Sequence, residues 1–147
     1  MAQQHEFIFQ PGNWIGEGKV AFSASPETLH FYTKWMIDKA NTNGIHTSQI
    51  VEIQGTEPSM RNIFVFSDVT PTNFVIVLEN EILGKVRGTG VIDDKTIAWE
   101  FHGNNGLEGF EVYELQDNGD YMLHAEYTSS PDQFRTVIDG RIWKKNA

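Results

Sequence analysis

PGNWIGEGKV, residues 11–20, places a tryptophan and two glycines at alternate positions of a predicted first β-strand. Alternate residues of a strand point to the same face of its sheet, so Trp14, Gly16 and Gly18 share one face. Glycine is a poor strand former, and two of them beside an indole indicate a face that cannot tolerate bulk. Two explanations fit: a barrel wall that coils sharply here, or an aromatic ring that lies against the backbone.

The rest of the chain alternates short β-branched and aromatic runs with turn-forming residues, at a spacing typical of hairpins. The predicted strands lie near residues 14–22, 28–38, 45–54, 60–67, 73–79, 84–92, 96–102, 107–115, 121–129 and 134–144. The connections are short and no helix is long enough to cover a sheet. These features predict an all-β fold, a single antiparallel up-and-down barrel of about ten strands, with residues 1–147 as one domain.

Residues 25–40 support two interpretations. Ser25 and Pro26 are typical of a capped helix start. The alternation from Leu29 to Ile37, with its aromatic and β-branched content, favours a strand that pairs with residues 45–53. We favour the strand.

The charge balance and composition limit the classes of partner. With 11 Lys plus Arg against 20 Asp plus Glu, the net charge of −9 argues against nucleic acid and anionic membranes. The absence of cysteine excludes thiolate catalysis and cysteine-based zinc sites. No apolar stretch reaches transmembrane length, so we expect no membrane insertion and a soluble, cytoplasmic protein. A homodimer is left open.

No signature of catalysis or metal binding appears in the chain. We find no nucleophile elbow, phosphate-binding loop, dinucleotide fingerprint or metal-ligand spacing, and therefore predict no catalytic residue, metal or cofactor. One pair keeps acid–base chemistry open: an interior Glu111 beside Tyr113, because a buried carboxylate has a raised pKa.

The two ends of the chain carry a family resemblance. Gly12-Asn13-Trp14 resembles the Gly-x-Trp signature of the calycin superfamily of lipocalins, fatty-acid-binding proteins and avidins. Residues 139–145 resemble the closing strand of those barrels, in which an Arg packs across the first-strand Trp. In fatty-acid-binding proteins an Arg-x-Tyr pair binds the ligand carboxylate. Here the matching positions are Arg141 and Trp143, so the hydroxyl is missing.

A second resemblance concerns haem. Gly16 and Gly18 extend the first motif to a pattern similar to that of nitrobindin-type barrels, which hold haem through a late His. No His follows His124, so haem is kept only as an alternative.

The barrel and the resemblance together predict binding of a small apolar or amphipathic molecule in the interior. The predicted ligand-binding residues are Trp14, Gly16, Gly18, Thr33, Trp35, Gln49, Phe64, Trp99, Phe101, Tyr113 and Arg141. Arg141 has two interpretations, a lock stacked on Trp14 or a ligand carboxylate site, and the alternation of its own strand places it outside.

Two other functions are left open. One is a barrel enzyme, such as an isomerase, cyclase or decarboxylase, acting on a lipid-like or phenolic substrate. The other is a packed barrel whose outer surface binds a protein, which predicts no cavity large enough for a ligand. Binding of a small molecule is favoured over both.

Overall fold

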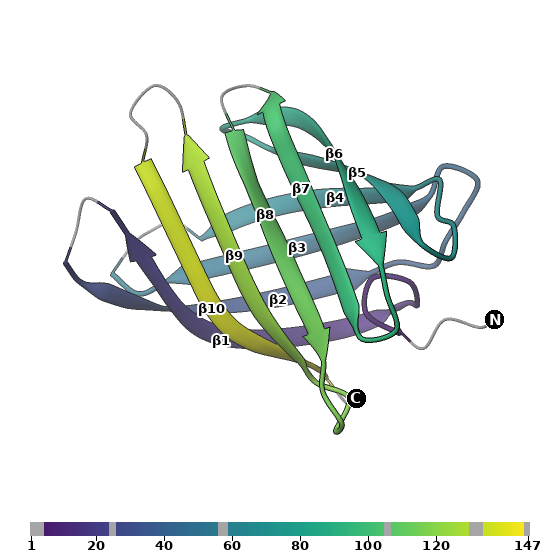
Figure 1. Cartoon of the computed structure of the whole chain (residues 1–147), viewed down its shortest axis with the longest axis horizontal. Helices are drawn as coiled ribbons and strands as arrows, with labels where there is room; N and C mark the ends of the chain where they lie inside the picture. Colours follow the sequence, from purple (N-terminus) through teal and green to yellow (C-terminus); the bar gives the residue numbers. More distant parts are fainter. Residues whose placement is uncertain (1–4, 24–25, 56–58, 105–106, 130–133, 146–147) are drawn as a thin grey trace.

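The computed structural model describes residues 5–23, 26–55, 59–104, 107–129 and 134–145. Within this part of the chain ten strands form (Figure 1). They are β1 (Gly12–Phe22), β2 (Thr28–Ile37), β3 (Ile45–Ile53), β4 (Met60–Ser67), β5 (Asn73–Asn80), β6 (Gly84–Ile92), β7 (Thr96–Asn104), β8 (Leu107–Leu115), β9 (Tyr121–Ser129) and β10 (Phe134–Lys144). The predicted strands match these ten to within a few residues at each end.

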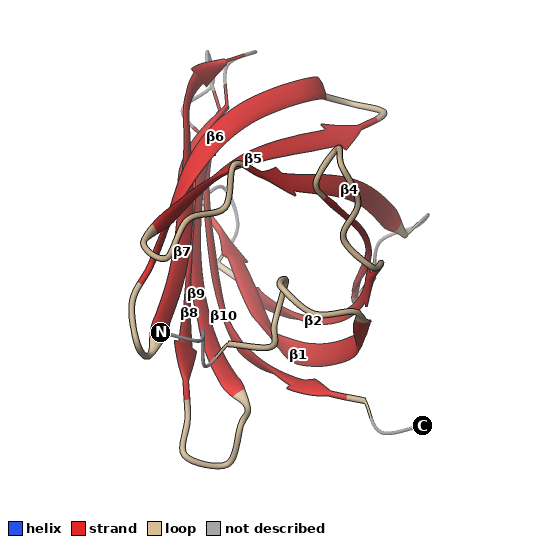
Figure 2. Cartoon of the chain, turned by 90° about the vertical axis from the view of Figure 1, so that its right-hand side faces the viewer, coloured by secondary structure: helices blue, strands red, loops and turns tan. Residues whose placement is uncertain are grey.

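The strands form one closed antiparallel barrel (Figure 2). Each strand pairs with the next along the chain, and β10 pairs with β1 to close the ring. Because strands consecutive in the chain are antiparallel neighbours in the sheet, the topology is up-and-down, as the short turns predict. The all-β fold and the strand count are confirmed.

The ambiguous segment forms a strand over residues 28–37. Phe31, Thr33, Trp35 and Ile37 are buried, and the residues between them are exposed, which is the period of two of a barrel wall. The helix alternative is therefore wrong for these residues, and they supply no helical lid. Ser25, its proposed cap, lies outside the described residues.

The N-terminal segment fills one end of the barrel, where β1 begins. Residues 5–10 make a tight turn in which the amides of Phe9 and Gln10 donate to the carbonyl of Glu6. Phe7 is fully buried at the centre of an aromatic cluster, with ring centroids 5.0–5.5 Å away. Its partners are Trp14, Trp35, Tyr113 and Tyr121.

A buried histidine anchors this turn to the wall. One ring nitrogen of His5 lies 2.6 Å from the Tyr121 hydroxyl, and the other lies 2.6 Å from the Asp93 carbonyl. Burial raises the pKa of Tyr121, so the phenol keeps its proton for this contact.

The two glycines of the opening stretch face inward where β1 runs against β10. A Cβ atom on Gly18 would lie 2.2 Å from the Asp139 carbonyl oxygen and 2.7 Å from the Phe31 ring. A Cβ on Gly16 would lie 2.4 Å from the Ile142 side chain. Both explanations of the sequence pattern hold at Gly18, since backbone and ring each exclude a side chain there.

In the part of the chain that the structure describes, no helix is long and apolar enough to cross a membrane.

We predict that Gly18→Ala destabilises the protein by about 1–3 kcal/mol, because the added methyl group meets backbone atoms that cannot move without disturbing the β1–β10 pairing. Chemical denaturation followed by circular dichroism measures this. Lys19→Ala, on the outer face of the same strand, is the control and should change stability by less than about 0.5 kcal/mol. Equal stabilities for the two variants would show that the glycine is not required by packing.

Candidate binding site in the barrel interior

A cavity of about 280 Å³ lies inside the barrel, in the half away from the N-terminal turn. Its wall is built from β1–β5 and β8–β10, with Leu83 of the β5–β6 turn at its edge. The lining residues are Val20, Phe22, Phe31, Gln49, Val51, Ile53, Met60, Asn62, Phe64, Leu78, Asn80, Leu83, Glu111, Tyr113, Leu123, Ala125, Tyr127, Thr136 and Ile138. Most are apolar, as in sites that bury small molecules.

Two larger hollows, of about 480 and 620 Å³, lie on the outer surface. Outward-facing side chains such as Tyr32 and Lys34 line the first, and Arg61 and Glu79 help to line the second. Several charged side chains line each of these hollows, whereas most of the residues that line the interior cavity are apolar. The interior is therefore the candidate site.

A partly buried carboxylate, Glu111, lies on the β8–β9 side of the cavity. Alternation along β8 points Glu111 and Tyr113 inward. The Tyr113 hydroxyl donates to Glu111 Oε1 at 2.5 Å, and the Tyr127 hydroxyl from β9 donates to Oε2. Each carboxylate oxygen thus has one phenol partner.

Burial raises the pKa of Glu111 above its ordinary value of 4.5. Tyr113 and Tyr127 oppose this rise because their hydrogen bonds stabilise the carboxylate. The indole of Trp99 also lowers the pKa of Glu111, although Trp99 Nε1 makes no hydrogen bond of ordinary geometry. The raised pKa expected of an interior Glu111 is confirmed in direction.

The two phenols keep their protons. Burial and the neighbouring Glu111 charge raise the pKa values of Tyr113 and Tyr127 well above the ordinary range. Both hydroxyls therefore remain donors to Glu111 at any physiological pH.

A chain of side-chain amides runs along the opposite wall. Gln49 donates to Thr33 Oγ1 at 3.1 Å, Asn62 donates to Gln49 at 2.9 Å, and Asn80 donates to Asn62 at 3.0 Å. Asn80 Oδ1 in turn accepts from the backbone amides of residues 82–83. Each NH₂ group has two hydrogens, so each amide keeps one N–H that these bonds do not use.

The ring order places these two polar groups across the barrel from each other. The amides come from β3, β4 and β5, and the carboxylate with its phenols comes from β8 and β9. A molecule between them would meet amide N–H groups on one side and carboxylate and phenol oxygens on the other.

Three of the predicted ligand-binding residues line the cavity: Gln49, Phe64 and Tyr113. Thr33 is buried behind Gln49 and accepts its hydrogen bond. These two polar side chains on an otherwise apolar face thus satisfy each other's hydrogen bonds, as buried polar groups require.

Four predicted aromatic residues belong to the packed core instead. Trp14 packs on Phe7 at the closed end, and Trp35 is stacked on Phe64 with ring centroids 5.2 Å apart. Trp99 lies against Tyr113 at 5.0 Å, and Phe101 is fully buried. None of these four lines the cavity among the described residues, so their role here is to support the wall.

The predicted roles of Arg141 and the two glycines need correction. Arg141 lies outside the barrel with 52% of its side chain exposed, and its guanidinium sits 4.8 Å above the Trp143 ring. Trp14 faces the interior, so the two residues lie on opposite sides of the wall and no Trp14–Arg141 lock forms. Gly16 and Gly18 make room for β10 and Phe31, not for a ligand.

Glu111, Tyr127, Asn62 and Asn80 line the cavity but are absent from the predicted ligand-binding set. Alternation in the sequence could have found the two asparagines. Asn62 shares the inner face of β4 with Phe64, and Asn80 is the last inward-facing residue of β5. Asn80 lies one residue beyond the predicted strand 73–79, whereas Asn62 lies within the predicted strand 60–67 and was not singled out.

We predict that Glu111→Gln gains stability relative to the wild type as pH rises. The native pKa exceeds that of the unfolded chain, so folding takes up a proton between the two values. Wild-type stability therefore falls through that interval, by roughly 1.4 kcal/mol for each unit of pKa rise, and then levels off. Gln cannot ionise and escapes this loss.

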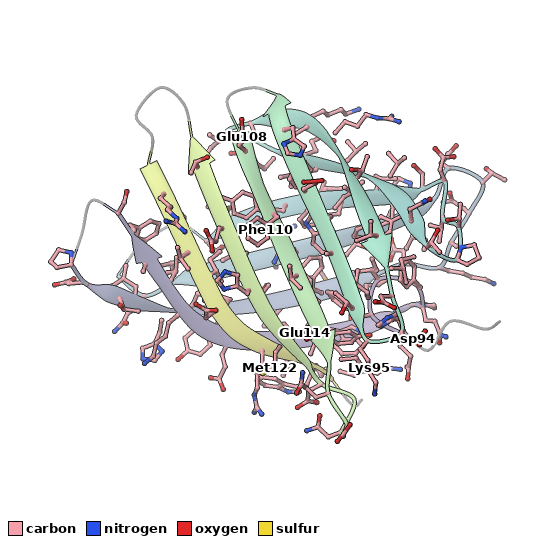
Figure 3. The ribbon with its side chains drawn as sticks, in the orientation of Figure 1. Asp94, Lys95, Glu108, Phe110, Glu114 and Met122 are labelled. Carbon is pink, nitrogen blue, oxygen red and sulfur yellow. The ribbon has the colours of Figure 1, made fainter. Side chains whose placement is uncertain are left out.

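The measurement is thermal unfolding from about pH 4 to pH 8. Glu114→Gln is the matched control, because Glu114 lies on the outer side of the same strand (Figure 3). If both variants follow the wild-type pH profile equally, the Glu111 carboxyl is not held in an apolar site.

Comparison with protein-family models and with curated proteins gives no match. The fold is similar to that of the S-type phycobiliprotein lyase CPES from Guillardia theta. The likeness has a TM-score of 0.70 and covers 94% of this chain and 89% of the lyase chain at 9% sequence identity. At this identity the likeness shows a shared barrel fold and nothing of the chemistry inside it.

Proposed function

We propose that this protein binds one small, predominantly apolar molecule inside its barrel. The observation that carries the proposal is the interior cavity of about 280 Å³, with apolar side chains on all its walls and a few polar groups that converge on it. The packed-barrel alternative predicts no such cavity. At the ~30 Å³ that a water molecule occupies in the liquid, the space admits roughly ten non-hydrogen atoms.

Burial of apolar surface supplies most of the expected affinity. A ligand that loses about 300 Å² of apolar surface gains about 7.5 kcal/mol at ~25 cal/mol per Å². Lost translational and rotational freedom offsets part of this gain. The burial gain alone would correspond to a dissociation constant of about 3 µM, so after this offset we expect larger dissociation constants, toward the millimolar range.

A barrel enzyme is the second candidate, and Glu111 is the observation that favours it. A carboxyl with a raised pKa, held by two phenols at the edge of a cavity, has the properties of a general acid or base. An enzyme would show a rate that follows Glu111 ionisation, whereas a carrier shows only saturable binding. The structurally similar protein is a phycobiliprotein lyase, but a shared fold alone locates no activity in this chain.

Isothermal titration calorimetry with nonan-1-ol tests the binding proposal. We expect saturable binding of one molecule per chain, with a negative heat-capacity change from apolar burial. Ala125 lines the cavity and is the register partner of Glu111 on the adjacent strand. Ala125→Phe should therefore fill part of the cavity and weaken this binding at least tenfold.

Met122→Phe provides the matched control, since Met122 lies on the outer side of β9 and is 49% exposed (Figure 3). It should bind nonan-1-ol like the wild type. The absence of saturable binding by the wild type, or equal binding by a folded Ala125→Phe variant, would contradict the proposal.

A further inference from the structure

The cavity contains an acidic side chain and no basic one. Among its described lining residues Glu111 alone is ionisable in the ordinary pH range, and Lys, Arg and His are absent from the lining. The neighbours that stabilise the carboxylate are the phenols of Tyr113 and Tyr127 and the indole of Trp99, which are all neutral. When Glu111 is ionised, its charge is hydrogen-bonded but not compensated.

The polar atoms around Glu111 offer acceptor capacity to a ligand. Each phenol has one proton, and both protons are already donated to the carboxylate. A carboxylate has about four lone-pair sites, of which these bonds use two. What remains at this wall is a set of carboxylate and phenol oxygens that can accept hydrogen bonds.

The aromatic rings at this point also favour positive charge. Tyr113 and Tyr127 both line the cavity, and both contact the Glu111 carboxylate. The faces of such rings attract cations, and groups of them recognise ammonium ions. Trp99 packs against Tyr113 with ring centroids 5.0 Å apart but is not one of the described residues that line the cavity, so the two phenol rings are the ones that a ligand cation can approach.

We propose that the ligand of this cavity is an apolar amine, or a related N–H cation, whose charged nitrogen pairs with Glu111. The proposal rests on the proposed function and specifies its ligand class. The apolar body of the amine occupies the space between Phe31, Leu78 and Ile138. The unused amide N–H groups of the opposite wall favour a ligand with an oxygen at its far end.

This ligand class is opposite in charge to the fatty acid that the family resemblance suggests. The expected carboxylate partner, Arg141, lies outside the barrel. A fatty acid in the cavity would bring its carboxylate into an apolar space that already holds Glu111, and like charges at short distance in such a space repel strongly.

Calorimetry with three probes of matched size tests the inference: nonylamine, nonan-1-ol and octanoate. At pH 7 the wild type should bind nonylamine at least tenfold more tightly than nonan-1-ol, and octanoate more weakly than either. Glu111→Gln should reduce the affinity for nonylamine at least tenfold and lower the ratio of nonylamine to nonan-1-ol affinity to about threefold or less. Glu114→Gln, outside the barrel, should preserve the wild-type order.

The outcomes separate the two proposals. If nonan-1-ol binds and nonylamine binds no more tightly, the amine inference is wrong and the binding function stands. If none of the three probes binds, both are wrong. Should Glu111→Gln fail to fold, the ranking of the probes on the wild type decides the inference alone.

Discussion

Inward-facing glycines covered by aromatic rings are the constraint on which the shape of this barrel depends. At four points an aromatic residue lies directly opposite a glycine on the neighbouring strand, and a ring atom lies within 2.7 Å of the position that a glycine Cβ would take. The pairs are Gly18 with Phe31, Gly88 with Phe101, Gly90 with Phe74, and Gly109 with Tyr127. Each ring occupies the space that a side chain on the glycine would fill, and sheets use such pairs to curve without losing their packing.

The same constraint positions the site. Tyr127 rests on Gly109, two residues before Glu111 on the same strand, and from there its hydroxyl reaches the carboxylate. The N-terminal turn and the large aromatic residues fill the other half of the interior, so the free space is confined to the half that contains Glu111. An ionised carboxylate beside a small apolar cavity raises the free energy of the folded protein when no ligand is bound. A cationic ligand lowers that free energy by pairing with the carboxylate.

Alternation in the sequence predicts which residues face inward, and it was enough for an interior Glu111, while the short hairpin connections predicted the ten-stranded barrel. It also placed Arg141 outside, correctly, and the expectation of a ligand contact for Arg141 came from the family resemblance. Alternation says nothing of depth along the barrel axis, which is why Trp35, Trp99 and Phe101 could not be separated from the cavity-lining Phe64. The buried turn around Phe7 was missed because its residues have no period and are held only by contacts distant in sequence.

Native mass spectrometry of the protein purified from the organism that produces it tests the central claim most directly. If the barrel is a binding protein, the wild type carries one reproducible small mass per chain that is lost on denaturation. Folded Ala125→Phe, made in the same cells, lacks that mass. A wild-type spectrum with the bare chain alone, or the same adduct on the variant with the filled cavity, would contradict the account of an interior ligand site.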